Sequence, residues 1–383
     1  MLQTIYDLTP KSGGPSTCVC DIMQGLFDID APVELLTVKP AEDEVKNLGE
    51  RSEWLTEVQC DYKTPLRLSH NVRKFLAESS YDLYHANTLW TDVAHSTCAY
   101  ARMKGKPYIL SPHGMLYPTA LAISTWKKKL MLGLWFNKDI REAACLHATC
   151  RQEMEHCRTF GYKGPIAVIP NAVVVPEGVN LKDKNYRDES GRRQIGFLGR
   201  LHPIKKVENV IYAISQLSIE ERSQLSFQIM GKYDERYEQW LKGETKRMGL
   251  ENCVEFIGFV SGEEKYYRLS KLSALMVPSV QENFGMIVPE ALVCGTPVYA
   301  SLGTPWEELN EYNAGWWKDN EPETIAGVIS EILSATDGQL LEKGQNGNRL
   351  IERKYEQHKV AEMMKHLYEW IVNGGVKPDF VYV

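Results

Sequence analysis

The sequence lacks several features that would place it in a specialised class of protein. No run approaches the ~20 apolar residues that a membrane-spanning helix needs. The first residues carry neither the basic region nor the apolar core of a secretory signal, so we expect a cytoplasmic protein. The nine cysteines are scattered with no CxxC pair, which indicates reduced thiols rather than a disulfide framework or a metal site. With 43% hydrophobic residues and 25% charged residues, the chain has the composition of a globular protein.

Acidic residues are missing from one long stretch. Residues 93–138 contain no Asp or Glu but seven Lys or Arg, whereas the whole chain has a net charge of −6. An acidic chain argues against general nucleic-acid binding, and a basic segment within it predicts an anionic ligand or surface. Residues 126–136 combine three lysines with an apolar run and two tryptophans, which fits an interfacial membrane helix. A core helix whose lysines face solvent fits the same residues.

Short apolar runs alternate with amphipathic stretches, which predicts an α/β protein with parallel sheets. Two doubly wound units fit a chain of 383 residues better than one large sheet. We expect an N-terminal domain over 1–178, a polar linker over 179–193 and a C-terminal domain over 194–358. We expect a last helix, within about 359–383, to join the N-terminal domain. The expected strands are 2–8, 33–38, 83–85, 108–111, 145–148 and 167–169, then 194–198, 226–230, 254–258, 274–278 and 297–301.

The segment from Glu282 to Glu290 follows an expected strand and leads into a helix with Pro289 in its first turn. In doubly wound sheets, ligands bind outside the carboxyl ends of the strands. The free N–H groups of a helix start attract phosphate, and Gly285 lets the backbone approach a ligand. The two carboxylates repel phosphate, so hydroxyls are their expected partners, and together these features predict a nucleotide-sugar site. A solvated Glu282 and a favourable helix charge at Glu290 would explain the same residues without a ligand.

A second motif runs from Gly199 to Lys206 after another expected strand. Arg200 offers a rigid fork and Lys205 a point charge, and both can converge on a diphosphate. Two cations could neutralise a departing diphosphate without a metal ion, so we expect neither a metal nor a cofactor. A solvated basic loop is the alternative interpretation.

Two weaker signals lie in the first half of the chain. Gly13 and Gly14 follow the first expected strand, and they permit a close approach to a phosphate or sugar, although a tight turn explains them equally well. His113 lies beside Gly114 at the carboxyl end of strand 108–111, where it could hydrogen-bond a substrate. An ordinary, internally satisfied histidine is the other possibility.

Taken together, these motifs resemble the GT-B glycosyltransferases of family GT4, a retaining group that acts on polysaccharides and glycolipids. Two short motifs, Gly303–Trp306 and His113–Leu116, are similar to the bacterial exopolysaccharide and lipopolysaccharide branch. The matching elements follow the family order: Gly13-Gly14, Ser111–Leu116, His147–Thr149, Ile169–Ala172, Gly199-Arg200 with Lys205, Glu282–Glu290, and Gly295–Pro297.

The resemblance implies a role for each candidate. Arg200 and Lys205 would hold the donor diphosphate and stabilise its charge as it leaves, and Glu290 would accept the ribose hydroxyls. Glu282 would contact the hydroxyls of the donor sugar, with His113 beside that sugar. The implied remaining donor contacts are Gly13 and Gly14, Phe259 within the base-flanking segment 257–260, and the backbone N–H groups of Asn283, Phe284, Gly285, Met286 and Ile287. Three positions depart from the pattern: Lys206 and Ala172 stand where glycine is usual, and Cys150 where serine is common.

The function that the resemblance implies is a metal-independent, retaining glycosyltransferase with two Rossmann-like domains facing a central cleft. Its donor would be a nucleotide sugar, with UDP favoured over GDP. Its acceptor would be a glycan or lipid-linked glycan of polysaccharide biosynthesis, reached by membrane contact through residues 126–136 at the inner face. Retention rests on the resemblance alone. The alternatives are a nucleotide-sugar epimerase or phosphorylase on the same fold, or a non-catalytic sugar-nucleotide-binding subunit.

Overall fold

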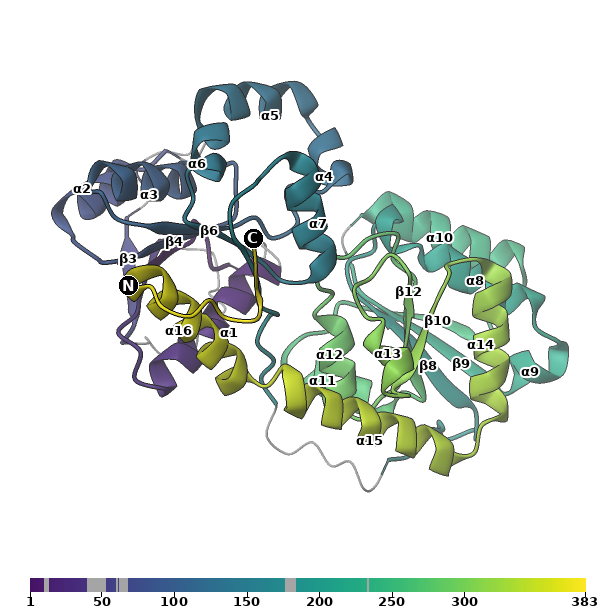
Figure 1. Ribbon diagram of the computed structural model, residues 1–383. Coiled ribbons are helices and arrows are strands. Elements are labelled where there is room, and N and C mark those ends of the chain that lie inside the picture. Colours follow the sequence, from purple (N-terminus) through teal and green to yellow (C-terminus); the bar gives the residue numbers. More distant parts are fainter. Residues whose placement is uncertain (10–13, 40–52, 60, 62–67, 176–183, 233) are drawn as a thin grey trace. The chain divides into compact units, whose positions relative to one another are not determined.

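The chain forms two compact units (Figure 1). The computed structural model describes residues 1–383 except 10–13, 40–52, 60, 62–67, 176–183 and 233. Unit 1 comprises Met1–Val174 and Tyr355–Val383, and unit 2 comprises Val175–Lys354. The chain therefore leaves unit 1 once and returns to it for its last helix.

Unit 1 is built on a sheet in the order β14-β7-β6-β5-β4-β1-β2-β3. Every neighbouring pair is parallel except β14 with β7. The strands are β1 Leu2–Thr4, β2 Glu34–Val38, β3 Leu55–Val58, β4 Tyr84–Asn87, β5 Tyr108–Ser111, β6 Cys145–Ala148, β7 Ile166–Val168 and β14 Val381–Tyr382. The helices are α1 Gly14–Asp28, α2 His70–Glu78, α3 Asp92–Met103, α4 Pro118–Ala122, α5 Thr125–Met131, the π-helix η2 Leu132–Phe136, α6 Asn137–Arg141, α7 Arg151–Phe160 and α16 Gln357–Asn373.

Unit 2 has a second parallel sheet, in the order β10-β9-β8-β11-β12-β13. Its strands are β8 Arg193–Leu198, β9 Leu225–Met230, β10 Val254–Gly258, β11 Ala274–Val277, β12 Val298–Ser301 and β13 Gly315–Lys318. Its helices are the 3-10 turn η3 Pro203–Lys205, α8 Val207–Gln216, α9 Ile219–Ser223, α10 Glu235–Arg247, α11 Gly262–Lys271, α12 Ile287–Val293, α13 Glu308–Glu311, α14 Pro322–Ser334 and α15 Asp337–Lys354. The two Rossmann-like sheets confirm the α/β fold class.

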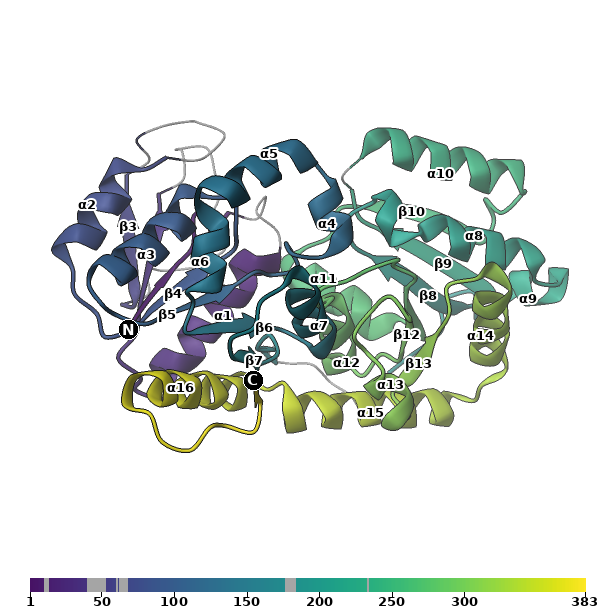
Figure 2. The ribbon, with the colours of Figure 1, turned by 45° about the horizontal axis from the view of Figure 1, so that its top comes forward.

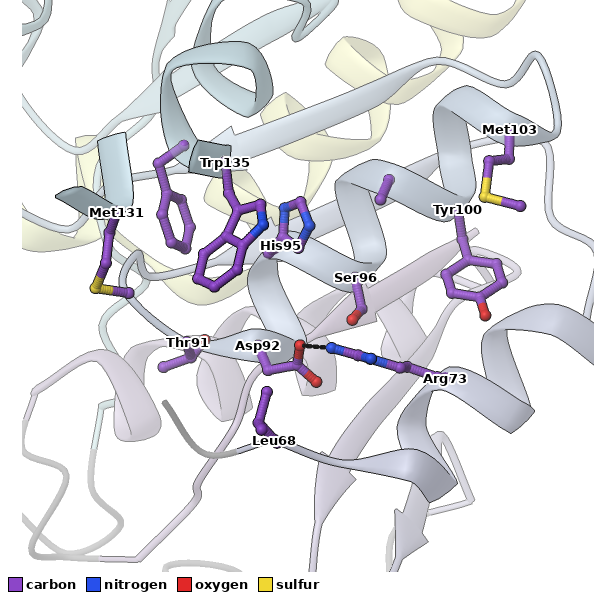
Figure 3. A pocket seen from close by; sticks show the side chains of 12 residues that line it. Leu68, Arg73, Thr91, Asp92, His95, Ser96, Tyr100, Met103, Met131 and Trp135 are labelled. Atoms are coloured by element: carbon purple, nitrogen blue, oxygen red, sulfur yellow. Dashed lines mark hydrogen bonds and ion pairs between the residues drawn. The ribbon is translucent and has the colours of Figure 1, made fainter. Parts of the chain in front are cut away.

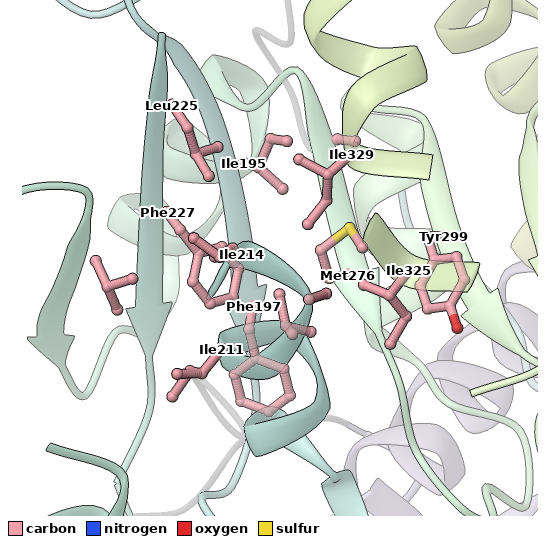
Figure 4. Packing of buried hydrophobic residues seen from close by; sticks show 14 of the residues in the cluster. Ile195, Phe197, Ile211, Ile214, Leu225, Phe227, Met276, Tyr299, Ile325 and Ile329 are labelled. Atoms are coloured by element: carbon pink, nitrogen blue, oxygen red, sulfur yellow. The ribbon is translucent and has the colours of Figure 1, made fainter. Parts of the chain in front are cut away.

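The core of unit 2 shows why these strands form (Figure 4). Ile195 and Phe197 of β8 are two residues apart, so both point to the same face of the sheet. Leu225 and Phe227 repeat the pattern on β9, and α8 and α14 cover this face with their own buried isoleucines. Burial on one face fixes the strand register, and so fixes where each strand ends and its loop begins.

The last helix, α16, belongs to unit 1, where it lies alongside α1 (Figures 1 and 2). A Cβ atom at Gly25 of α1 would lie only 2.9 Å from the Cγ atom of Gln357, so glycine there lets the two helices approach closely. Its buried residues Val360, Ala361, Met364, Leu367 and Tyr368 pack into the core of unit 1.

The structure departs from the sequence-based expectations at several elements. Residues 179–193, predicted to be a linker, are described from Lys184 onwards, and there they pack onto unit 2. Lys184 Nζ donates to the carbonyl oxygens of Cys294 (2.8 Å) and Gly295 (2.7 Å). These two hydrogen bonds attach the polar segment to unit 2. The predicted helix 126–136 divides into α5 and η2, and β1 is shorter than the expected strand 2–8. The strands β3, β13 and β14 form where no strand is expected.

The structure also bears on the expectations for membrane-spanning helices and for the cysteines. Within the described part of the chain, no helix has both the length and the apolarity to cross a bilayer. The eight cysteines that the structure describes are all buried.

Candidate active site

The two strongest sequence motifs meet at the carboxyl ends of neighbouring strands in unit 2. One loop follows β8 and the other follows β11, and these strands pair in the sheet. The backbone N–H of Val280 donates to the carbonyl oxygen of Ile204 at 2.8 Å, which ties the two loops together. Lys205 Nζ then forms an ion pair with Glu282 Oε1. The structure therefore brings the predicted cation and the predicted carboxylate into one site.

This ion pair is largely screened from water. The exposed fractions of the two side chains are 18% for Lys205 and 12% for Glu282. The hydroxyl of Ser279 donates to the same carboxylate oxygen at 2.7 Å. A partly buried carboxylate needs such partners, because burial without them disfavours the charged form. The pair is thus a pre-positioned positive and negative group at a strand end.

A tight turn positions Lys205. It is the last residue of η3, whose first turn is capped by the His202 ring accepting from the N–H of Ile204 at 3.2 Å. The next residue, Lys206, has φ = +52°, a left-handed conformation that costs a side-chain-bearing residue energy. This explains why glycine is usual at that position in the family that the sequence resembles.

The Glu282 loop is braced by the loop after β12. The N–H of Glu282 donates to the carbonyl oxygen of Gly303 at 3.0 Å. A Cβ atom at Gly303 would lie 2.0 Å from the carbonyl oxygen of Val280, so no larger residue fits. The indole N–H of Trp306 donates to the carbonyl oxygen of Phe284 at 2.6 Å, and the two rings pack edge to face. The motif Gly303–Trp306 therefore supports the site, a role that the sequence analysis did not assign.

Glu290, on α12, has a partner that sequence reasoning missed. Lys265 Nζ of α11 lies 2.9 Å from Glu290 Oε1. Burial alone would lower the pKa of Lys265, but the charge of Glu290 raises it above its usual value. Lys265 therefore stays charged beside this carboxylate. The two residues lie on different helices with no local pattern connecting them, so the sequence alone carries no signal for the pair.

The other predicted residues of unit 2 lie on the same loops. Arg200 is exposed in the loop after β8, and Phe259, directly after β10, has an exposed fraction of 73%. Gly285 has φ = +77°, and an added Cβ would lie 3.4 Å from the Cγ atom of Glu282. Phe284 is buried, whereas Asn283, Met286 and Ile287 are partly exposed.

His113 lies in unit 1, in the loop after β5, with φ = +50°. Its Nε2 atom is 3.1 Å from Asn87 Oδ1. Burial and then the nearby His147 lower the pKa of His113 to about 3, so the ring is neutral. The buried carboxylate of Glu153 accepts from the N–H of Gly114 at 2.5 Å and from the N–H of Thr149 at 2.7 Å, which holds this loop to α7.

The two predicted glycines lie at and just before the start of α1. Gly13 lies outside the described residues. Gly14 is the exposed first residue of α1, and an added Cβ there would meet no atom within 4 Å. Among the residues that the structure describes, none therefore requires glycine at position 14.

The segment 126–136 presents apolar side chains to solvent. The exposed fractions are 68% for Trp126, 56% for Leu130 and 59% for Leu134, and no residue of α5 is buried. Lys128 differs from its neighbours, because its Nζ donates to the carbonyl oxygen of Ala120 and lies 5.8 Å from the ring centroid of Trp90. A helix buried wholly in the core does not fit these exposures.

A pocket of about 410 Å³ opens on unit 1 between α2, α3 and η2 (Figure 3). Met131 and Trp135 form one wall, and an ion pair between Arg73 and Asp92 forms another. Among the described residues, none of the predicted site residues lines this pocket.

Comparisons with known proteins identify the family. Residues 13–172 match the family model "Glycosyl transferase 4-like domain", and residues 180–356 match "Glycosyl transferases group 1". An uncharacterized glycosyltransferase of Methanocaldococcus jannaschii is 30% identical over 271 residues, which is 68% of each chain. The 2-deoxystreptamine glucosyltransferase of Streptomyces kanamyceticus is 25% identical over 280 residues, covering 69% of this chain and 66% of that protein.

Solved structures agree on the fold. The Anabaena protein HepE, in complex with UDP and glucose, superimposes with a TM-score of 0.72 at 19% identity, covering 96% of this chain and 98% of its own. WaaG, a glycosyltransferase involved in lipopolysaccharide biosynthesis, gives a TM-score of 0.69 at 13% identity, covering 98% and 100%. At such identities the likeness shows the fold, which is GT-B. The chain belongs to the group 1 glycosyltransferases.

Proposed function

We propose that the protein is a retaining GT4 enzyme that transfers a sugar from a UDP-sugar to a glycan or lipid-linked glycan, without a metal ion. The observation that carries the proposal is the pairing of Lys205 with Glu282 at the carboxyl ends of β8 and β11. It joins a cation suited to phosphate with a carboxylate suited to sugar hydroxyls. Retention is supported only by the resemblance in sequence motifs.

The proposed chemistry uses the ion pair as a prepared site. Before the donor binds, Glu282 holds Lys205 in place. In the complex, Glu282 accepts from hydroxyls of the donor sugar, and Lys205 and Arg200 face the diphosphate. Negative charge grows on the diphosphate as the glycosidic bond breaks, so cations fixed in advance stabilise the transition state more than the ground state.

Glu290 has the proposed role of binding the ribose. An ionised carboxylate has several acceptor sites, so a bond to Lys265 leaves others for hydroxyls. Lys265 orients Glu290 through their ion pair, which makes Lys265 a positioning residue. Phe259 is exposed at the end of β10, where an aromatic ring could flank the base. The backbone N–H groups around Gly285 would complete the phosphate and sugar contacts.

UDP is the favoured nucleotide because the Anabaena neighbour binds UDP together with glucose. A thermal-shift screen against UDP- and GDP-sugars tests the proposal. A ligand at about 100 times its Kd stabilises the folded state by about 2.7 kcal/mol, which is readily measured. We expect a UDP-sugar to raise the Tm of the wild type and to raise that of Glu290→Ala less.

Product analysis with each nucleotide sugar that binds separates the alternative functions. A sugar nucleotide that binds without any transfer or hydrolysis indicates a non-catalytic subunit. Turnover to another sugar nucleotide, or turnover that requires inorganic phosphate, indicates an epimerase or a phosphorylase. No shift with any nucleotide sugar contradicts the proposed site. The anomeric configuration of the product, read by NMR, decides whether transfer is retaining.

Peripheral membrane contact through residues 126–136 is part of the same proposal. Exposed Trp126, Leu130 and Leu134 beside exposed lysines are the composition of an interfacial helix. Such contact would hold the enzyme near a lipid-linked acceptor.

A further inference from the structure

A buried chain of polar side chains crosses unit 1 and ends at His113. Its members come from four neighbouring strands and from the last helix of the protein. Protein interiors tolerate such groups only when each donor and acceptor is matched. The members are Gln3 of β1, His85 and Asn87 of β4, Ser111 of β5, His147 of β6 and Tyr368 of α16, all of them buried.

The direction of the hydrogen bonds can be worked out from one end. The carbonyl oxygen of Ile169 can only accept, so His147 Nε2, 2.8 Å away, carries the proton. In a neutral ring Nδ1 is then an acceptor, and the Ser111 hydroxyl, at 2.8 Å, donates to it. Since Ser111 has given its only proton, it accepts from His85 Nε2 at 2.6 Å. His85 Nδ1 must therefore accept from the hydroxyl of Tyr368, at 2.8 Å.

The other end gives the same direction independently. Asn87 Nδ2 lies 3.4 Å from the carbonyl oxygen of Thr4, which can only accept, so the Asn87 amide is oriented with its nitrogen on that side. The same nitrogen donates to Gln3 Oε1 at 2.9 Å, and Gln3 Nε2 then donates to the Tyr368 oxygen at 2.8 Å. Tyr368 is left with one proton to donate, which goes to His85. The two derivations agree at Tyr368.

This orientation decides which nitrogen of His113 carries the proton. Asn87 presents its Oδ1 atom to His113 Nε2 at 3.1 Å, and an amide oxygen can only accept. The rings along the chain are neutral, because burial lowers the pKa of His147 to about 4 and that of His85 well below its usual value. A neutral ring that donates through Nε2 has an unprotonated Nδ1.

We infer that this one-directional chain fixes His113 as its Nε2–H tautomer and presents Nδ1 as a hydrogen-bond acceptor for a substrate hydroxyl. A phosphate oxygen is itself an acceptor, so it could not form a hydrogen bond with the unprotonated Nδ1 of His113. Gln3, Asn87 and Tyr368 are positioning residues that act through His113. The substrate part of this inference rests on the proposed function, whereas the tautomer does not.

Nitrogen-15 NMR of histidine-labelled protein tests the tautomer without any substrate. The chemical shifts of the two ring nitrogens and their couplings to ring protons identify the protonated nitrogen. We expect His85, His113 and His147 all to be neutral Nε2–H tautomers at pH 7, with the His113 signals identified by their loss in His113→Gln. A protonated Nδ1 in His113 overturns the inference.

The positioning role is tested by Tyr368→Phe, with Tyr162→Phe as the matched control. Tyr162 is also buried in unit 1, and its hydroxyl donates to the carbonyl oxygen of Ala143 at 3.0 Å. Tyr162 is not a member of the hydrogen-bonded chain of side chains that ends at His113. We expect Tyr368→Phe to add an Nδ1–H form of His113 and to lower kcat/KM by about tenfold, the value of one neutral hydrogen bond. The control should change neither.

The outcomes separate two kinds of failure. A wild-type tautomer and wild-type kcat/KM in a folded Tyr368→Phe protein overturn the positioning role. If the wild type transfers no sugar from any donor, the proposed function fails, while the NMR result still decides the tautomer.

Discussion

Membrane contact through α5 and η2 gives the prediction with the sharpest internal control. The sequence offers three consecutive lysines, but the structure separates them. Lys127 and Lys129 are exposed, whereas the Lys128 ammonium turns back to the carbonyl oxygen of Ala120. Burial also lowers the pKa of Lys128. Only two of the three lysine charges are therefore available for the proposed membrane contact.

The expected change in vesicle binding follows from the number of exposed lysines. Each lysine near an anionic leaflet contributes ~1 kcal/mol, so the two exposed lysines contribute ~2 kcal/mol. The double variant Lys127→Gln with Lys129→Gln should therefore bind vesicles about 30-fold more weakly. The single variant Lys128→Gln should bind within about twofold of the wild type, because its charge does not face the lipid. Replacing Trp126 or Leu130 with Ser should also weaken binding, through lost apolar insertion.

Co-sedimentation with vesicles rich in anionic lipid measures the effect. The wild type should bind at low salt and be released as salt rises, since screening weakens the charge term. Melting temperatures of all variants serve as the folding control. Absence of wild-type binding at low salt would refute membrane contact. A loss in Lys128→Gln as large as in the double variant would refute the assignment of the lysines.

Three further predictions concern catalysis and stability. In steady-state transfer assays, Lys205→Ala and Arg200→Ala should each lower turnover by ~10²-fold or more. Glu290→Ala should chiefly raise the Kd of the donor. Near wild-type turnover in both folded cation variants would contradict the roles assigned to the two cations. Transfer should persist in EDTA, and a complete loss that Mg²⁺ or Mn²⁺ restores would show that the cations do not suffice. Burial lowers the pKa of Lys184 to about 7 from its usual 10.5. At this group the unfolded chain therefore binds more protons between these values, so Lys184 adds up to about 1.4 kcal/mol per pH unit to the slope of the unfolding free energy above pH 7. Other groups, the thiols included, also titrate in this range, so urea unfolding between pH 7 and about 8.5 is compared between the wild type and Lys184→Met. The wild type should have the more positive slope, and equal slopes in the two proteins would contradict the assignment.

The sequence by itself determined most of the secondary structure, because helices and central strands are set by local patterns. Tyr108–Ser111, Cys145–Ala148 and Val254–Gly258 form with the bounds that their apolar runs predict. The strands that were not predicted, β3, β13 and β14, are peripheral. Gly315 of β13 illustrates the reason, since a Cβ there would lie 2.0 Å from the carbonyl oxygen of Val298. Such a strand depends on its neighbour more than on its own pattern.

The sequence also determined the candidate site residues, because a cation or glycine that follows an expected strand can be recognised from the sequence alone. Only the tertiary structure decided how they combine. Lys205 meets Glu282 because β8 pairs with β11, and strand order is not encoded in either motif. The partner of Glu290 on α11 and the hydrogen-bond chain to His113 join residues from distant parts of the chain. Sequence patterns report which face a residue occupies, whereas hydrogen-bond partners are fixed by packing between elements.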